Sequence, residues 1–212
     1  MHHASAPMQD PQLCAVTLLG NLVAKPDIRY RANPVSAITE IVIATSSKWL
    51  DKKTTQYKEW TSYHHVKVEG ILVEQALLQA EKGDVILVQG YLSNIRPSSS
   101  TVSNHPPIVH ASFIQKFDKG YTQSVNQIHC SGQIVSPPQL ITTANNKQMA
   151  QVNITINQQV YDIEKQSWQT ILLERELHVW GKQALSLADK ANVGDNIMVE
   201  GKLSYLATAA KT

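Results

Sequence analysis

The sequence contains two related copies of one pattern of about ninety residues. The first copy holds Gly20, Pro26, Gly70, Gly83 and Gly90, and the same residue types recur in order at Gly132, Pro138, Gly181, Gly194 and Gly201. The segments around these glycines also match, since VEGILVEQALLQAEKGDVILVQGYL corresponds to VWGKQALSLADKANVGDNIMVEGKL. A unit of this length is too long for a solenoid repeat and suits a small domain. We therefore expect two similar domains in the 212 residues.

Each copy has the pattern of short strands interrupted by one helix. In the first copy, the β-branched and apolar runs AVTLLGNLV, AITEIVIAT, YHHVKVEG, DVILVQGYL and IVHASFIQKF predict five strands. The segment between Gly70 and Gly83 has helical spacing and lacks Gly and Pro, so a helix is expected between the third and fourth strands. This order is typical of the OB fold. We predict an all-β protein, with one short helix per domain, built as two tandem five-stranded OB-fold barrels.

The polar segment DKGYTQSVN suggests where the two domains are joined. We predict a disordered N-terminus at residues 1–11, a first OB domain at 12–118, a linker at 119–126 and a divergent second OB domain at 127–212. The second copy has no counterpart of IVHASFIQKF. Either it lacks its last strand or another segment covers that edge, because an open strand edge is liable to pair with other chains.

The composition limits the functions that the chain can have. Charged residues make up 17% of the chain and the formal net charge is only +2, so binding of nucleic acid would need a local concentration of positive charge. No apolar run is long enough for a membrane span, and the N-terminus lacks the basic start and apolar core of a signal peptide. We therefore expect a cytoplasmic protein.

The reactive residue types show no catalytic or metal-binding pattern. Cys14 and Cys130 are too few for a disulfide framework or a zinc site, and we expect ordinary core thiols in a reducing compartment. The eight histidines show no paired metal-ligand spacing. No nucleophile–base set or paired carboxylates stand out. We therefore expect no enzymatic activity, no metal and no cofactor.

Residues 48–67, KWLDKKTTQYKEWTSYHHVK, combine positive charge with aromatic rings. The lysines are Lys48, Lys52, Lys53, Lys58 and Lys67, and the rings interleaved with them are Trp49, Tyr57, Trp60 and Tyr63. Lysines neutralise phosphates and flat rings stack on unpaired bases, so both together are typical of a protein that binds single strands with little sequence preference.

The length between Trp49 and Tyr63 fits a long, exposed β-hairpin arm with DKKT at its tip. Strand alternation places Tyr63, His65 and Lys67 on the outer face, and His64 on the inner face with the valines. We expect His64 to be a hydrogen-bonded histidine at the edge of the core rather than a ligand. A solvated hairpin whose aromatic side chains anchor it to the barrel is the alternative to a binding arm.

Two further groups of residues are weaker candidates for DNA contacts. Arg29 and Arg31 lie in a polar segment between the first two strands, where they contact either phosphate or a structural carboxylate partner. The second copy offers three rings, Tyr161, Trp168 and Trp180. Its third strand also carries Glu174 and Glu176 on one face, and these would repel phosphate. The second copy is therefore either mainly an assembly partner or a weaker DNA contact.

The first copy resembles the bacterial single-stranded DNA-binding protein family. LLGNLVAKPDIRY is similar to the opening strand and GNLxxxP[ED][VI]RY segment of the family, IATSSKW to its ATSxxW, and KGDVILVQGYL to its KGxxVx[VI]xGxL. The resemblance covers residues 13–117, and the second copy is similar over 127–206. It implies OB barrels that bind single-stranded DNA without catalysis.

The resemblance also implies particular residues and an assembly. The stacking residues of the family fall on Trp49 and Tyr63, whereas its third aromatic position is Glu69 in the first copy and Trp180 in the second. Tandem-barrel members reach four barrels as homodimers, so a homodimer is expected. The chain ends LATAAKT without the acidic tip by which the family recruits partner proteins, so recruitment by that route is not expected.

The sequence thus predicts a tandem OB-fold protein of the bacterial cytoplasm and nucleoid that binds single-stranded DNA in replication, recombination, repair or DNA transfer. The alternative is a module for protein–protein assembly in a replication or conjugation complex, with residual DNA binding. The predicted DNA-binding residues are Arg29, Arg31, Lys48, Trp49, Lys52, Lys53, Tyr57, Lys58, Trp60, Tyr63, His65, Lys67, Tyr161, Trp168 and Trp180.

Overall fold

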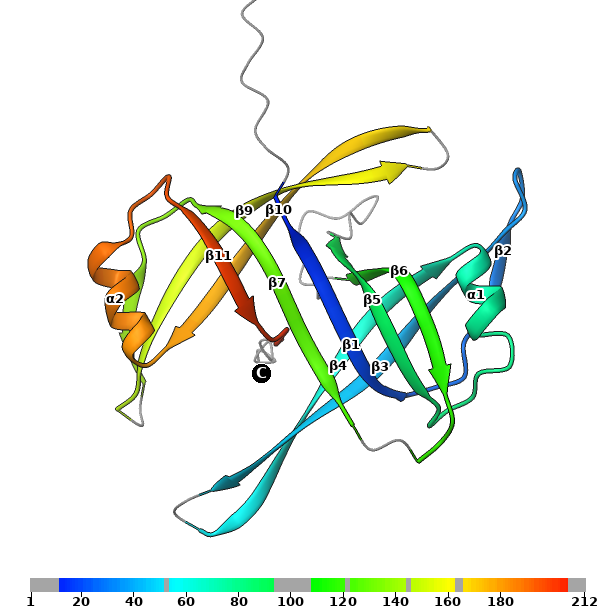
Figure 1. Ribbon diagram of the computed structural model, residues 1–212, viewed down its shortest axis with the longest axis horizontal. Helices are drawn as coiled ribbons and strands as arrows, with labels where there is room; N and C mark the ends of the chain where they lie inside the picture. Colours follow the sequence, from blue (N-terminus) through cyan, green and yellow to red (C-terminus); the bar gives the residue numbers. More distant parts are fainter. Residues whose placement is uncertain are drawn as a thin grey trace, which may run out of the picture. The chain divides into compact units, whose positions relative to one another are not determined.

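Strands make up most of the structure, as the apolar runs predict (Figure 1). A computed structural model describes residues 12–51, 54–93, 108–120, 123–143, 146–162 and 166–205. The chain divides into two units. The N-terminal unit contains Ala15–Ile128 together with the segment that begins at Glu200, and the C-terminal unit contains His129–Val199 together with the segment that ends at Cys14.

The N-terminal unit is a closed five-stranded barrel with one helix. Its elements are β1 (Cys14–Leu22), β2 (Arg29–Arg31), β3 (Ser36–Asp51), β4 (Gln56–Glu69), α1 (Ile71–Ala76), β5 (Val85–Ser93) and β6 (Ile108–Phe117). Strand β1 pairs with β5, β5 with β6, β6 with β4, and β4 with β3. A short pairing of β3 with β1, Asn21 opposite Ala44, closes the ring. The predicted OB-fold architecture is confirmed.

The core of this barrel follows from strand alternation. In β1, Val16, Leu18 and Leu22 are buried, and in β4 the buried residues are His64, Val66 and Val68. Inward residues two positions apart share one face of a strand, so each strand contributes an apolar row to the barrel interior.

Two of the repeated glycines, Gly20 and Gly132, lie where two strands approach each other closely. A Cβ atom on Gly20 would lie 2.2 Å from the carbonyl oxygen of Ala44, and one on Gly132 would lie 2.7 Å from that of Thr155. Only glycine lets the backbones of the two strands approach so closely at this point. The glycine pair therefore marks the same strand contact in both copies.

Helix α1 is shorter than the segment between the glycines suggests. It begins after Gly70, whose φ of 63° is in the left-handed region, and it ends at Ala76. Leu77 and Ala80 are nevertheless buried, because the chain turns inward there instead of continuing the helix. The helix thus ends at Ala76, although the helical spacing of the sequence continues, because the turn that follows buries apolar side chains.

Residues Arg29–Arg31 form the short strand β2, whereas the sequence suggested a loop. Arg29 lies opposite Ile38 and Arg31 opposite Ser36 on β3. The turn between the two strands contains Asn33 with a φ of 63°, a left-handed conformation that asparagine tolerates. Turn geometry rather than an apolar pattern produces this strand, which explains why the sequence did not reveal it.

The C-terminal unit repeats this plan in part. Its elements are β7 (Val125–Ile134), β8 (Gln139–Thr142), β9 (Gln148–Asp162), β10 (Ser167–Trp180), α2 (Lys182–Lys190) and β11 (Asn196–Gly201), and the ends of β7 and β11 extend into the N-terminal unit. Strand β9 pairs with β7, β8 and β10, and β11 pairs with β7. Among the described residues of this unit, no strand corresponds to β6.

The two units exchange short segments of chain. In the C-terminal unit, the amide of Gln12 donates to the Asn157 carbonyl at 2.8 Å and that of Ser131 to the Leu13 carbonyl at 2.9 Å. The segment at the start of the first copy therefore supplies backbone pairing to the C-terminal unit. The units therefore differ at their ends from the continuous ranges 12–118 and 127–212, and the predicted N-terminus 1–11 lies outside the described residues.

Both cysteines are buried thiols of the C-terminal unit, and they form no disulfide with each other. Burial raises the pKa of Cys130 to about 11, with a further contribution from the neighbouring Cys14. A thiol with a raised pKa and no access to solvent is unreactive. This is consistent with the expectation of core thiols.

Candidate nucleic-acid interface

Strands β3 and β4 form a long hairpin whose outer part extends beyond the barrel (Figure 1). They pair without interruption from Ile38 opposite Glu69 to Asp51 opposite Gln56. We call residues 47–51 and 56–61 the arm. The turn at its end contains Thr55, with a φ of 51°, while Lys52 and Lys53 lie outside the described residues.

The aromatic rings of the hairpin are open to solvent. The side chains of Tyr57, Trp60, Tyr63 and Trp49 are 78%, 65%, 56% and 45% exposed. Large rings usually lie in cores, and four exposed rings on one hairpin form an apolar surface of the kind that marks a binding site. The alternative in which the rings anchor the hairpin to the barrel does not fit this exposure.

The pairing register divides the predicted residues between two faces of the hairpin. Trp49 lies opposite Lys58, and Trp60 lies opposite Ser47. Residues directly opposite each other in an antiparallel pair project to the same side, and neighbours along a strand project to opposite sides. The tryptophan face therefore carries Ser47, Trp49, Asp51, Lys58 and Trp60. The tyrosine face carries Lys48, Leu50, Tyr57, Glu59, Tyr63, His65 and Lys67.

The predicted phosphate-binding side chains have carboxylate partners. The ammonium groups of Lys48, Lys58 and Lys67 lie 3.6, 2.5 and 2.8 Å from carboxylate oxygens of Glu59, Asp51 and Glu69. Arg31 lies 3.4 Å from Glu69 and Arg29 lies 2.8 Å from Asp27. The pairs of Arg29, Arg31 and Lys48 are exposed and worth at most about 1 kcal/mol each, so a phosphate can replace the carboxylate at little cost. In the other two pairs, Asp51 and Lys67 are partly buried.

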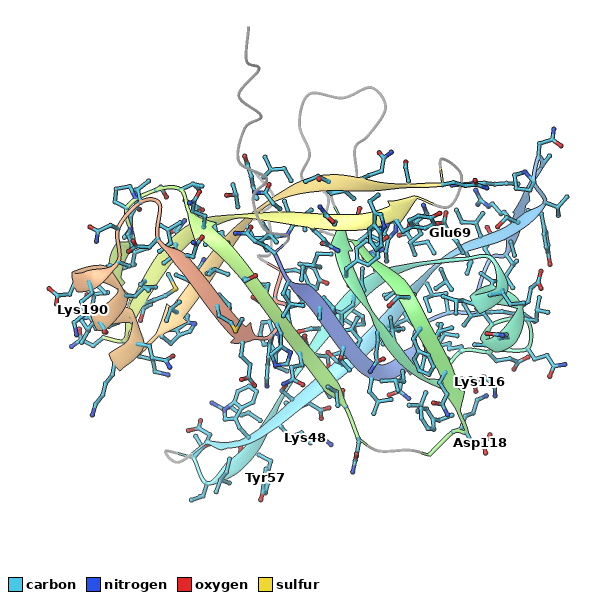
Figure 2. The ribbon with its side chains drawn as sticks, turned by 45° about the horizontal axis from the view of Figure 1, so that its top comes forward. Lys48, Tyr57, Glu69, Lys116, Asp118 and Lys190 are labelled. Carbon is cyan, nitrogen blue, oxygen red and sulfur yellow. The ribbon has the colours of Figure 1, made fainter. Side chains whose placement is uncertain are left out.

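Figure 2 shows that Lys48 and Tyr57 project from the arm, whereas Glu69 lies at the opposite end of β4. His65 lies between these ends, and its Nδ1 is 2.8 Å from Oε1 of Glu40. Basic side chains therefore lie along the tyrosine face, from Lys48 on the arm to Lys67 on the barrel.

His64 is a satisfied core histidine, as the sequence suggested. It is fully buried, and its Nε2 lies 2.8 Å from Oγ1 of Thr45 while its Nδ1 lies 3.0 Å from the hydroxyl of Tyr205. Burial lowers the pKa of His64 to about 4, so the imidazole is neutral at pH 7. Across the described residues, no group of three or more potential metal ligands occurs.

The C-terminal unit has a second long hairpin, β9–β10, with its own rings. Tyr161 lies opposite Trp168 and the two rings meet edge to face at 5.4 Å. Trp180, at the other end of β10, is exposed and borders a hollow lined also by Lys147 and Leu185. The structure thus places these three predicted residues at two separate sites.

Carboxylates separate these two sites along β10. Glu174 and Glu176 are exposed on the strand. An oxygen of Glu176 also lies 2.7 Å from Nε2 of His178. This surface is less favourable for phosphate than the arm of the N-terminal unit, because two negative charges lie on the path between the rings.

No sequence pattern indicated that residues near the C-terminus contribute to the N-terminal unit. Lys202 and Tyr205 lie at the end of the second copy, yet their side chains contact Ser47 and His64 of the first. Neither residue is a fixed position of a motif, and only the path of the backbone at the end of β11 brings them there.

Comparisons with known proteins agree with this architecture. The single-strand binding protein family matches residues 13–111 and again residues 125–212. The crystal structure of wild-type single-stranded DNA binding protein from Thermus aquaticus is similar, with a TM-score of 0.72 and 26% identity over 91% of this chain and 85% of that chain. A deletion mutant of the Thermus protein gives a TM-score of 0.73 and 26% identity over 92% of this chain and 87% of that one. With both copies matched, this chain belongs to the single-strand binding protein family.

Proposed function

We propose that this chain binds single-stranded DNA with little sequence preference and without catalysis, using the β3–β4 hairpin of its N-terminal unit. The observation that carries the proposal is the exposure of four aromatic rings beside lysines on one hairpin. Every unpaired base offers a flat face, so rings bind bases regardless of sequence, at about 1–3 kcal/mol per stacked base.

The two faces of the hairpin suggest how a strand is held. Bases stack on Trp49 and Trp60 on one face and on Tyr57 and Tyr63 on the other, while Lys48, Lys58 and Lys67 exchange their carboxylate partners for phosphates. A two-stranded ribbon twists strongly, so a flexible single strand can follow both faces. Arg29, Arg31 and His65, nearer the barrel, extend the basic path. Lys52 and Lys53, which lie outside the described residues, stay predicted contacts.

Duplex DNA is a poor ligand for this surface, because its bases are already stacked and paired. Binding therefore keeps a single strand unpaired and shields it from nucleases. Such an activity serves replication, recombination, repair or DNA transfer at the nucleoid. Pairing of two chains into a homodimer would bring four OB folds together around one strand.

The dependence of binding on salt tests this proposal. If three lysines of the hairpin replace counterions on phosphates, log affinity for oligo-dT should fall with log salt concentration with a slope of about −2 or steeper. Fluorescence titration of the exposed tryptophans at several salt concentrations measures this slope. A duplex of the same length is the control and should bind more weakly at each concentration. A slope near zero would contradict phosphate binding by the hairpin.

The C-terminal unit has a second candidate role, as an assembly module. The exposed glutamates on β10 favour this role, because they disfavour DNA there. The salt titration separates the proposed function from an assembly role of the whole chain, since a chain with only residual DNA binding shows little salt-dependent affinity for oligo-dT.

A further inference from the structure

A segment from the end of the second copy is fixed on the N-terminal unit. We call residues 200–205 the C-terminal strap. The side-chain amide of Asn126 donates to the Leu203 carbonyl at 2.8 Å, and the Leu203 amide donates to Oδ1 of Asn126 at 2.9 Å. Gln127 adds a bond from Nε2 to Oε1 of Glu200 at 3.2 Å. This reciprocal pairing holds the strap in a defined register.

Tyr205 anchors the end of the strap in the barrel. Its hydroxyl lies 3.0 Å from Nδ1 of His64, and the two ring centroids are 5.5 Å apart. Thr45 engages the other nitrogen of His64. Burial raises the pKa of Tyr205 to about 12, so the phenol stays protonated beside the neutral imidazole. A neutral imidazole has one donor and one acceptor, and the two hydroxyls satisfy both.

Between these anchors, Lys202 reaches the tryptophan face. Its Nζ lies 3.4 Å from Oγ of Ser47. Ser47 lies directly opposite Trp60 and two residues before Trp49, so all three share one face of the hairpin. A flexible ammonium group is thereby held beside two exposed indole rings.

Lys202 differs from the lysines of the hairpin because it has no carboxylate partner among the described residues. Lys48, Lys58 and Lys67 all lie near carboxylates. Within the part of the chain that the structure describes, Lys202 is exposed and forms no ion pair. A ligand phosphate can therefore bind the Lys202 ammonium group without first displacing a carboxylate.

We propose that Lys202 is a phosphate-binding residue of the tryptophan face, and that Tyr205 is a positioning residue that holds the strap in place. This inference rests on the proposed function. A base stacked on Trp49 or Trp60 brings its backbone phosphate to the edge of the face, where the Lys202 ammonium donates to it. The end of one repeat thus completes the binding surface of the other.

The test compares Lys202→Gln with Lys190→Gln, which removes an exposed lysine from α2 of the other unit. Lys202→Gln should make the salt slope for oligo-dT less steep by about 0.7, which corresponds to one phosphate. Lys190→Gln should leave the slope unchanged. Trp49→Ala/Trp60→Ala is measured in parallel, because it reports the stacking surface itself.

Tyr205→Ala tests the positioning role by two readouts. Its salt slope should match that of Lys202→Gln, and combining the two substitutions should add no further loss. In an NMR titration, the pKa of the His64 imidazole should be higher in this variant than in the wild type, because loss of the Tyr205 ring reduces the burial that lowers it.

The outcomes separate this inference from the proposed function. If the double tryptophan variant loses affinity while Lys202→Gln keeps the wild-type slope, the role of Lys202 is wrong and the proposed function stands. If the double tryptophan variant binds as tightly as the wild type, the tryptophan face is not used and this inference fails, whereas the proposed function fails only if the wild type itself shows a salt slope near zero. A changed slope in Lys190→Gln equal to that of Lys202→Gln would overturn the assignment, because it would show a charge effect that does not depend on position.

Discussion

Replacing Trp49 and Tyr63 together by alanine should weaken binding of oligo-dT by about 2–5 kcal/mol, because each ring loses a stacked base. Both rings are exposed on the hairpin, so their removal leaves the barrel core intact. Affinity is measured by fluorescence anisotropy of labelled oligo-dT, because this signal does not depend on tryptophan fluorescence.

Leu50→Ala is the matched control for this prediction. Leu50 is a 48% exposed apolar side chain on the same arm, opposite Tyr57, but it has no ring. Its replacement should leave the affinity within a few tenths of a kcal/mol. Equal losses for the control and the double variant would show that apolar area, and not stacking, holds the strand.

The same measurement can assign the two faces of the hairpin. Trp49→Ala/Trp60→Ala removes the rings of the tryptophan face, and Tyr57→Ala/Tyr63→Ala removes those of the tyrosine face. A strand that follows both faces loses affinity in both variants, whereas a strand confined to one face loses it in only one.

Gly90→Ala should destabilise the N-terminal unit by about 3 kcal/mol or more. A Cβ atom on Gly90 would lie 1.9 Å from the His110 carbonyl oxygen, at the irregularity in the pairing of β5 with β6. Both contacting groups belong to paired backbone, so neither can move without breaking the barrel sheet. The melting temperature should fall by on the order of 10 °C, measured by circular dichroism or calorimetry.

Gly201→Ala provides the comparison, because a Cβ atom there has no heavy atom within 4 Å. It occupies the equivalent place in the second copy, and its melting temperature should change little. Equal stability of the two variants would show that the close approach at Gly90 does not constrain the barrel.

The sequence predicted the features that depend on local pattern. Apolar alternation located the strands that form the barrel, and it correctly placed His64 inside and Tyr63 outside. The repeated glycines marked real close contacts and helix starts, such as Gly20 and Gly70. The strand faces could be predicted because buried and exposed side chains alternate along a strand, and this alternation is visible in consecutive residues.

The features that the sequence did not reveal depend on register and on distant contacts. The division of Trp49 and Tyr63 between two faces follows only from the pairing of Trp49 with Lys58. That register is set by a turn whose length the sequence leaves open. The exchanged segments, with Lys202 beside Ser47, depend on where the backbone leads after β11. No local pattern records such a path.

Photo-crosslinking tests the central claim most directly. Oligo-dT that contains 5-iodouracil is irradiated in complex with the full chain, and the adducts are located by mass spectrometry of the peptides. Adducts are expected on Trp49, Trp60, Tyr57 or Tyr63 of the β3–β4 hairpin, and they should disappear when unlabelled oligo-dT competes. Specific adducts found only outside this hairpin would contradict it.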